Sequence, residues 1–515
     1  MIPKRRFPIL LRLCLVLICS TLLLARAEVK LPGLFSDGMV LQQGVRAPIW
    51  GWADAGEEVT VSFRGKKASA TASDGKWRVK LPVQKAGGPD TLIVEGKNRI
   101  ELKNVLVGEV WICSGQSNME FPLSHSFESE NDIANSANPN LRLFPVPKLK
   151  ANEPVDDVRA RWQECNPDTV TNFSAVAYYF GRDLQKAREV PVGLIHTSWG
   201  GSPAEVWMSE KVLESNPEYK NAILEAYGAA LKNYQDALER FKREEADLKS
   251  QEKDAGRKPP SPPFWKPAEL YNGMIAPLAP YAIKGAIWYQ GESNAGRAWQ
   301  YRRLFPDMIR NWRHDWGQGD FAFLAVQLAP WDRNKKRNID QITATPVDSD
   351  WAELREAQLL ASRVLPKVGL AVITDVGDKD DIHPTKKAPV GGRLALLARN
   401  IAYGEKVECC GPRYRQMRVK GNQVILDFDH VGGGLESRGG RLRGFAVCGP
   451  DKRFVWADAN VDDGKVIVSS PQVGKPVAVR YGWADYPVVN LFSREGLPAS
   501  PFRTDDFPLT TAPKK

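Results

Sequence analysis

Four polar segments of this chain each follow a short apolar run, and together they contain the residue types of nucleophilic catalysis. Ser117 comes after the first run and His383 after the last. A serine hydroxyl beside an imidazole is the arrangement in which a general base activates a nucleophile. The runs and the polar segments after them are 105–112 before 114–118, 190–197 before 199–202, 283–289 before 290–294, and 369–374 before 378–384.

The carboxyl ends of parallel strands meet at one edge of a sheet, so residues far apart in the sequence converge there. We therefore predict that Ser117 and His383 lie together at such an edge and carry out a hydrolysis. Taken singly, the same residues allow plainer interpretations. Ser117 or Asn118 could cap a helix, and His383 could be a surface histidine in an acidic loop. The alternative function is a non-catalytic sugar-binding protein on the same fold.

The rest of the chain indicates which elements position these residues. From 105 to 403, apolar runs alternate with helical patterns, which predicts an α/β domain with a parallel sheet and helices on both faces. Residues 28–104 and 404–515 show strand patterns separated by turn residues. We predict a small β-sandwich before the α/β domain and a β-rich domain after it. The helical patterns lie at 175–187, 301–312, 354–365 and 391–403.

A helical insertion at about 215–265 interrupts the α/β domain. Apolar residues recur here at spacings of three and four with charged residues between them, namely Leu224, Tyr227, Leu231, Tyr234, Leu238 and Phe241. This pattern predicts an amphipathic helix of heptad character, ended by the proline-rich segment 258–263. Such a helix is either an arm that shapes substrate access or a dimer contact, or it lies on its own domain.

Residues 1–27 have the pattern of a secretory signal peptide, with basic residues at 4–6, an apolar stretch and an A-x-A cleavage site at 25–27. An uncleaved membrane anchor is the alternative. Without this segment the chain has 66 basic and 61 acidic residues, so its net charge falls from +10 to +5. So mild an excess is typical of a solvated surface. We predict a secreted or periplasmic protein that binds neither nucleic acid nor, after cleavage, a membrane.

The cysteines indicate few cross-links. Five remain after residue 27, and an odd number excludes a fully paired disulfide framework. Cys409 and Cys410 are adjacent, so at most one of them can bridge to Cys448, while Cys113 is expected in the core. The sequence contains no C-x-x-C pair and no H-E-x-x-H motif, so no zinc site is expected.

Long motifs of the central domain resemble those of the sialate O-acetylesterase family. They are GQSNMEF (115–121), SWGGSPAEVWMS (198–209), GAIWYQGESNA (285–295), LREAQL (354–359) and DIHPTKK (381–387), together with the N-terminal LFSDGMVLQQ…APIWGWA (34–53). The resemblance runs in order from about residue 31 to 403. That family is similar to the SGNH, or GDSL-type, hydrolases. The resemblance implies a flavodoxin-like fold and a carbohydrate O-acetylesterase that needs no metal or organic cofactor, acting on acetylated sialic acid, xylan or another glycan.

The resemblance also implies roles for single residues. Ser117 matches the nucleophile, and His383 matches the general base that later acts as acid. Gly200 is similar to the glycine whose N–H joins that of Ser117 in the oxyanion hole. Most SGNH enzymes complete this hole with the asparagine of a G-x-N-D motif, which is missing here. We expect the Gln290 amide to replace it, and each such donor stabilises the transition state by about 3–4 kcal/mol.

The acid that orients His383 has three candidates. Asp381 stands two residues before the histidine, as in the D-I-H-P pattern of the sialate esterases. Asp380 stands three before it, as in the common SGNH pattern. Glu292 is the choice that related acetylesterases with a Q-G-E motif suggest. We favour Asp381, then Asp380, then Glu292.

Five further residues flank these motifs and are expected to bind the substrate. The ring of Trp199 could stack on a sugar face, although packing in the core explains a tryptophan equally well. Arg297 is a candidate partner for the carboxylate of a sialic acid. The other three are Asn118, Gly201 and Asn294. The oligomeric state is not readable from the sequence.

Overall fold

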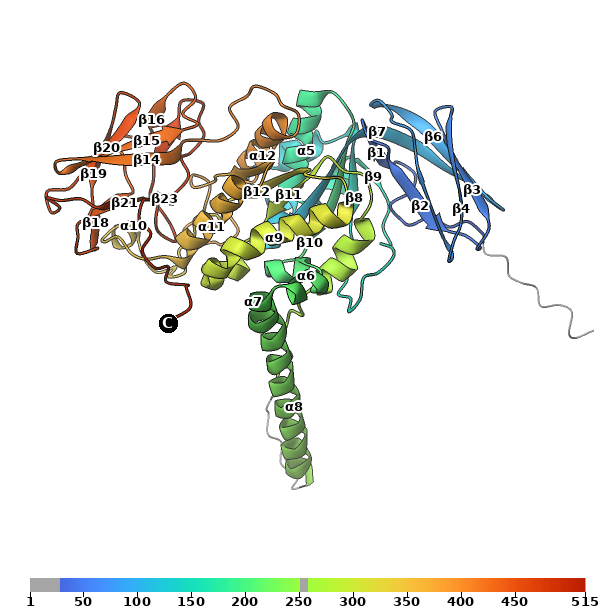
Figure 1. Ribbon diagram of the computed structural model, residues 1–515, viewed down its shortest axis with the longest axis horizontal. Helices are drawn as coiled ribbons and strands as arrows, with labels where there is room; N and C mark the ends of the chain where they lie inside the picture. The colour runs from blue at the N-terminus through green and yellow to red at the C-terminus, as the bar shows by residue number, and fades with distance from the viewer. Residues whose placement is uncertain (1–27, 251–257, 515) are drawn as a thin grey trace, which may run out of the picture.

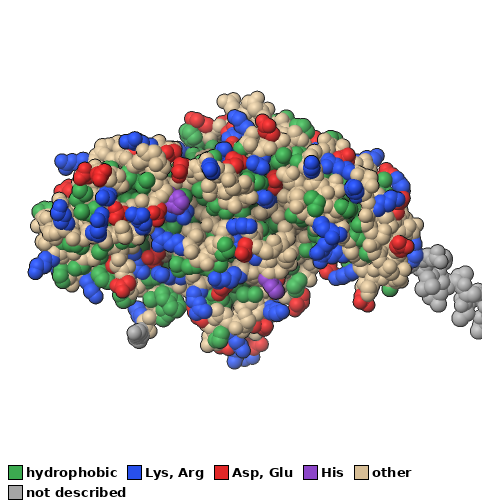
Figure 2. Space-filling view, turned by 45° about the horizontal axis from the view of Figure 1, so that its top comes forward, with side chains coloured by type: hydrophobic (Ala, Val, Ile, Leu, Met, Phe, Trp, Pro, Cys, Tyr) green, Lys and Arg blue, Asp and Glu red, His purple; other side chains and the backbone are tan. Residues whose placement is uncertain are grey.

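The computed structural model describes residues 28–250 and 258–514, so the predicted signal peptide lies outside the described residues. Figure 1 shows a central α/β body with a β-domain on either side and one long helix that projects from the body. Among the described residues, no helix is long and apolar enough to cross a membrane. On the face that Figure 2 shows, basic and acidic side chains are interspersed.

The central sheet has the strand order β13-β12-β11-β7-β10-β8-β9, and its neighbouring strands are parallel except for β8 and β9. The strands β7 and β10 to β13 follow the doubly wound order of flavodoxin. β8 and β9 extend the sheet beyond them. The strands are β7 (Arg99–Gly115), β8 (Asn138–Pro145), β9 (Gln163–Cys165), β10 (Val192–Ser198), β11 (Gly285–Tyr289), β12 (Ala322–Val326) and β13 (Val368–Ala371).

Helices cover both faces of this sheet (Figure 1). Ile287 of β11 points to the face covered by α5 (Ala175–Arg188) and α12 (Ala388–Ile401). Its neighbour Trp288 points to the opposite face, which α9 (Ala298–Trp316) and α11 (Asp350–Val364) cover. Successive side chains of a strand alternate between faces, so a strand buried on both sides must be apolar throughout. The predicted α/β class is confirmed.

The N-terminal domain packs two β-layers, in which the strands are antiparallel except for the parallel pair of β1 and β7. Alternate residues of β3, such as Val59 and Val61, share a core with Trp77 and Val79 of β5. β7 crosses the predicted boundary at 104, because it pairs first with β6 and further along with β10. The N-terminal domain and the central sheet therefore share one strand. The remaining strands are β1 (Val40–Gln42), β2 (Pro48–Trp52), β3 (Glu58–Phe63), β4 (Lys66–Thr71), β5 (Lys76–Lys80) and β6 (Gly87–Glu95).

The C-terminal residues form β-strands around a separate core. Arg355 of α11 ties this domain to the central one. Its buried guanidinium donates to the carbonyls of Leu328 and Ala329 and to those of Ala484 and Asp485 in the C-terminal domain. The strands are β14 (Arg413–Lys420), β15 (Gln423–Asp429), β16 (Leu435–Ser437), β17 (Phe445–Cys448), β18 (Phe454–Trp456), β19 (Asp458–Asp462), β20 (Lys465–Ser469), β21 (Ala478–Tyr481), β22 (Leu491–Ser493) and β23 (Phe502–Arg503).

The insertion forms the projecting helix α8 (Ala226–Ser250), which Figure 1 shows standing away from the body. The interpretation that this helix lies on its own domain is therefore wrong. Shorter helices connect the larger elements: α2 (Ser117–Glu120), η1 (Leu123–His125), α3 (Glu130–Ala134), α4 (Pro167–Val170), η2 (Ala204–Trp207), α6 (Glu210–Ser215), α7 (Pro217–Tyr219), η3 (Lys220–Glu225), η4 (Tyr271–Ile275), η5 (Ala276–Leu278), η6 (Glu292–Arg297) and α10 (Ile339–Ile342).

The cysteines of the described residues are free, so neither Cys409 nor Cys410 is bridged to Cys448, a pairing that the sequence left open. The reason is that these residues belong to different parts of the fold. Cys448 is buried at the end of β17 in the C-terminal domain, whereas Cys409 packs against the α5 and α12 layer of the central domain. Cys113 is fully buried in β7, as predicted.

Candidate active site

Ser117 begins α2 two residues after β7 ends. Gly115, the last residue of β7, has a φ of +144°, and a Cβ at this position would lie 2.1 Å from the carbonyl oxygen of Tyr289. Glycine is therefore required where the chain leaves the sheet. His383 comes from the loop between β13 and α12, and its Nε2 lies 2.8 Å from Ser117 Oγ. The structure brings the hydroxyl and the imidazole together across 266 positions of sequence.

The surroundings of His383 keep its ring neutral near pH 7. Burial lowers the pKa of His383 below its ordinary value of 6.5, the carboxylate of Asp381 acts in the opposite direction, and the ammonium of Lys387 lowers the pKa further. A neutral imidazole whose Nε2 faces a hydroxyl accepts the hydroxyl proton as a general base. The pair is therefore set up for nucleophilic attack by Ser117.

Of the three candidate acids, Asp381 contacts His383. Its Oδ1 accepts the backbone N–H of His383 at 2.8 Å and lies 3.7 Å from the ring Nδ1. Asp380 is wrong for this role, because its carboxylate turns to Lys379. Glu292 is also wrong for it, because its Oε1 accepts from Asn118 at 2.6 Å. The Asp381 side chain is 60% exposed, so water screens its pairing with the imidazole.

Two backbone N–H groups lie beside the Ser117 hydroxyl. Ser117 is the first residue of α2, where N–H groups have no acceptor within the helix. Gly200 follows β10, and a Cβ on it would lie 3.3 Å from Ser117 Cβ. The Gly200 N–H donates to Glu120 Oε2 at 2.6 Å, so a carboxylate oxygen already occupies this donor. The arrangement suits an oxyanion once Glu120 moves aside.

Gln290 and Asn294 belong to a buried network instead. The Gln290 amide donates to the carbonyl of Ser202 at 3.2 Å and to Asn294 Oδ1 at 2.7 Å, and its oxygen accepts from Tyr301 at 2.8 Å. Both amide hydrogens are thus engaged, so the expectation that Gln290 completes the oxyanion hole is wrong. Asn294 is 1% exposed and donates to Glu205, so its expected contact with substrate is wrong as well.

The other residues that were expected to bind substrate differ in whether they face the cavity beside Ser117. Trp199 lines the cavity beside Ser117, as a sugar-stacking ring should. Arg297 pairs with Glu205 at 2.5 Å, so its guanidinium is not free for a substrate carboxylate. Gly201 has a φ of +74° and accepts hydrogen bonds that hold its loop. Asn118 is fully buried behind the nucleophile and makes its contacts with protein groups.

A cavity of about 680 Å³ lies beside the Ser117–His383 pair. The Nζ of Lys148 is 2.5 Å from Glu120 Oε1 and 5.4 Å from the centre of the Trp199 ring. Glu120 therefore joins the Gly200 N–H to the Lys148 ammonium. The cavity is lined by Ser117, Glu120, Phe121, Pro122, Val146, Lys148, Asn172, His196, Ser198, Trp199, Gly200 and His383.

Five polar residues of this cavity were missed by the sequence analysis. Glu120 and Ser198 stand inside the family motifs, which is the signal that could have found them. Lys148, Asn172 and His196 have no comparable signal. The Nε2 of His196 lies 2.7 Å from Ser198 Oγ, and burial lowers the pKa of His196 to about 4. His196 is therefore uncharged at neutral pH.

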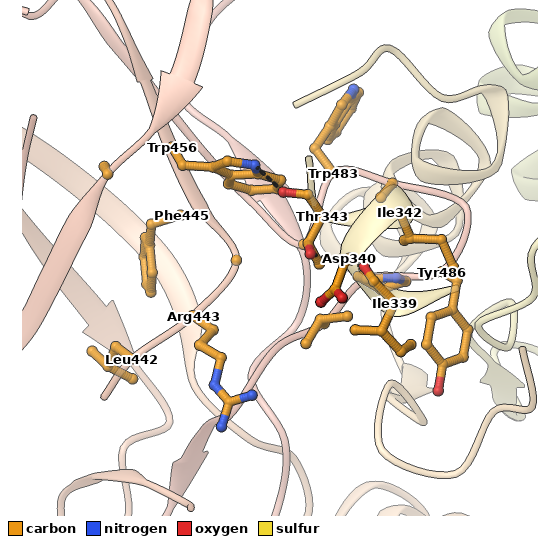
Figure 3. Close-up of a pocket in the computed structure, with 16 residues that line it drawn as sticks. Ile339, Asp340, Ile342, Thr343, Leu442, Arg443, Phe445, Trp456, Trp483 and Tyr486 are labelled. Carbon is orange, nitrogen blue, oxygen red and sulfur yellow. Dashed lines mark hydrogen bonds between the residues drawn. The ribbon is translucent and has the colours of Figure 1, made fainter. Parts of the chain in front are cut away.

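A second cavity, of about 380 Å³, lies between α10 and the C-terminal domain (Figure 3). Trp456 reaches across it, and its indole N–H donates to the carbonyl of Thr343 at 2.7 Å. Its lining is largely apolar and aromatic, with Asp340 and Arg443 as the charged side chains. None of the sixteen described residues that line it is a serine, cysteine or histidine.

The environment of His383 predicts its titration. Because burial outweighs the Asp381 carboxylate, an NMR titration of the His383 ring should give a pKa below 6.5. Asp381→Asn removes the group that raises this pKa, so the variant should titrate at still lower pH. A wild-type pKa above 6.5, or no change in Asp381→Asn, would contradict this description of the site.

Comparisons with known proteins agree with the geometry. The sequence profile of the family described as "Carbohydrate esterase, sialic acid-specific acetylesterase" matches residues 107–251 and 261–397. Sialate O-acetylesterases of Homo sapiens and Mus musculus are 28% and 29% identical to this chain, over 91% and 90% of it and 91% and 92% of their own lengths. A carbohydrate acetylesterase from Xanthomonas citri has a similar structure, with a TM-score of 0.80, 38% identity, and coverage of 93% of this chain and 100% of that one.

The matched segments make up more than half of the chain and contain both Ser117 and His383. They confirm the resemblance that the motifs indicated, and the chain is a carboxylic-ester hydrolase. It belongs to the family of carbohydrate esterases described as sialic acid-specific acetylesterases.

Proposed function

We propose that this protein removes acetyl groups from sugar hydroxyls by means of the nucleophile Ser117. The observation that carries the proposal is the 2.8 Å contact between Ser117 Oγ and His383 Nε2 at the wall of a 680 Å³ cavity. The family supports an acetylesterase, and the geometry supports a serine mechanism because the hydroxyl, a neutral base and two N–H groups converge there.

The reaction proceeds in two acyl transfers. Ser117 Oγ attacks the acetyl carbonyl while His383 Nε2 takes its proton, and the carbonyl oxygen becomes an oxyanion held by the N–H groups of Ser117 and Gly200. The bond to the sugar oxygen then breaks, and His383 returns the proton to that oxygen. Water, deprotonated by His383, attacks the acetyl-enzyme, and acetate and free Ser117 are released.

Glu120 has to leave the Gly200 N–H before this donor can hold the oxyanion. Its carboxylate oxygen lies 2.6 Å from that nitrogen, where the substrate oxygen is to be placed. The other carboxylate oxygen is held by Lys148, so Glu120 can give up the N–H and keep a cation as partner. When the substrate enters, its carbonyl oxygen thus replaces the Glu120 carboxylate oxygen as the acceptor of the Gly200 N–H.

Ser117→Ala tests the nucleophile. Acetate release from an aryl acetate should fall by about 10⁴-fold or more, because the variant lacks the hydroxyl that His383 activates. The thermal unfolding temperature should stay close to that of the wild type, which shows that the loss is chemical. Substantial turnover by a folded Ser117→Ala protein would rule out the serine mechanism.

The charges around the cavity bear on the choice of sugar. The family description names sialic acid, whose carboxylate needs a cation. Here Lys148 is paired with Glu120, Arg297 is paired with Glu205, and His196 is neutral. An acidic sugar would have to compete with Glu120 for Lys148, whereas a neutral acetylated sugar meets charges that are already balanced. The pairing favours a neutral glycan such as acetylated xylan over sialic acid.

A comparison of substrates decides between acetylated xylan and acetylated sialic acid. We expect kcat/KM to be about tenfold higher for an acetylated xylo-oligosaccharide than for an O-acetylated sialic acid. Glu120→Gln leaves Lys148 without its carboxylate, so the ratio should shift severalfold toward the sialic acid. Lys148→Met is the matched control and should not produce this shift. A wild-type preference for the sialic acid that Lys148→Met abolishes would instead establish sialate as the substrate.

We also propose that the protein is exported, on the strength of the signal-peptide pattern in residues 1–27. N-terminal sequencing of protein recovered from the periplasm or the medium of an expressing cell should begin at Glu28. Recovery of the full-length chain from the membrane fraction would support the anchor instead.

A further inference from the structure

Asn118, the residue after the nucleophile, makes three hydrogen bonds with two other segments of the chain. Its amide nitrogen donates to Glu292 Oε1 at 2.6 Å and to the carbonyl oxygen of Ile382 at 3.0 Å. Its oxygen accepts from the Nζ of Lys387 at 2.5 Å. Asn118 is fully buried, so these contacts use both of its amide hydrogens and leave none for the substrate.

Lys387 is a fully buried cation that the acyl-transfer steps do not use. Its ammonium lies 4.7 Å from the centre of the Phe121 ring and 5.4 Å from that of Tyr289. Burial lowers the pKa of Lys387 to about 7, although the charges of Glu292 and Asp381 act against this. A buried ammonium is costly unless it is hydrogen-bonded and paired with an opposite charge.

Glu292 supplies the opposite charge. Burial raises its pKa, and the Asn118 hydrogen bond and the Lys387 charge counteract that effect. The second carboxylate oxygen, Oε2, is buried and has no hydrogen-bond partner among the described residues. Since Asn118 contacts both groups, its amide bridges the buried ammonium and carboxylate directly behind Ser117.

One arm of this bridge reaches the backbone beside His383. Ile382, whose carbonyl oxygen accepts from Asn118, is the residue before His383, and Asn118 is the residue after Ser117. The amide therefore ties the backbone of the base to the backbone of the nucleophile. The Asp381 carboxylate, which accepts the His383 N–H, is exposed to solvent, and beyond the histidine the Thr385 carbonyl accepts from Ser126 Oγ and the Phe127 N–H. A displacement of about 1 Å at such a pair reduces the rate by about 100-fold.

We propose that Asn118, Lys387 and Glu292 form a positioning unit that holds His383 against Ser117. The inference rests on the proposed acyl transfer. The charged groups that face His383 are Asp381, on its own loop, and Lys387, which begins the turn into α12. Because Lys387 lowers the pKa of His383, removal of its charge raises that pKa.

Lys387→Met and Lys386→Met form a matched pair for the test. Each removes one positive charge from the same loop, but Lys386 is exposed and Lys387 is buried. With an aryl acetate as substrate, Lys387→Met should move the acid limb of the kcat/KM profile upward by roughly 0.5 pH units or more. Lys386→Met should leave the limb in place. Equal profiles and equal kcat values for the two variants would remove Lys387 from the positioning unit.

Substitutions of the other two residues test positioning. Asn118→Asp keeps the shape but loses both N–H donors, so kcat should fall by about 100-fold while KM stays within about twofold. Glu292→Gln keeps an oxygen for Asn118 and should retain activity within about fivefold, whereas Glu292→Ala should not. A rise in KM at unchanged kcat in Asn118→Asp would show a substrate contact and overturn the proposal. A collapse of activity in Glu292→Gln would do so too, because it would make Glu292 the acid of the triad.

The two proposals fail separately. Activity that survives Ser117→Ala removes the serine mechanism and this inference with it. If Ser117→Ala is inactive but Lys387→Met and Asn118→Asp behave like Lys386→Met, the positioning unit alone is refuted. Thermal unfolding of each variant shows whether it folds. Should Lys387→Met not fold, the kcat and KM of Asn118→Asp and Glu292→Gln decide the matter.

Discussion

The parallel pairing of β7 with β10 on one side and with β11 on the other is the constraint on which the site depends. These ladders bring Gly115 level with Ser198 and Tyr289, so the three strands end at one edge of the sheet. Ser117, Gly200 and the loop after β11 directly follow these strand ends, so they lie together at the same edge. The close approach of Gly115 to Tyr289 shows how little space this convergence leaves.

Polar networks on two sides of Ser117 complete the site, one partly exposed and the other buried. On the cavity side, Glu120 joins the Gly200 N–H to Lys148. On the far side, Asn118 joins Glu292 to Lys387. Each network contains a carboxylate and an ammonium near Ser117. A side chain of α2, Glu120 in the first and Asn118 in the second, takes part in it. Such networks stabilise a protein less than apolar packing does, but they fix geometry.

Both flanking β-domains are connected to the central domain that carries the site. β7 serves the N-terminal sheet in its first half and the central sheet in its second, so the nucleophile turn is attached to both. On the opposite side, Arg355 binds carbonyls of the C-terminal domain next to Asp485. The chain between β12 and α11 is held to the same domain through Trp456 and Thr343. The central domain is therefore bonded to a β-domain on each side.

Much of this could be predicted from the sequence, because the relevant signals are local. Apolar runs specify buried strands, helical periodicity specifies the covering helices, and a serine and a histidine after strand ends specify the reactive pair. The tertiary structure decided the rest, because it depends on which side chains meet. Asp381 rather than Asp380 faces the ring, and Gln290, Asn294 and Arg297 are engaged by Ser202 and Glu205. A hydrogen bond between Asn118 and Glu292, 174 positions apart, leaves no trace in local sequence, since only the fold brings its partners together.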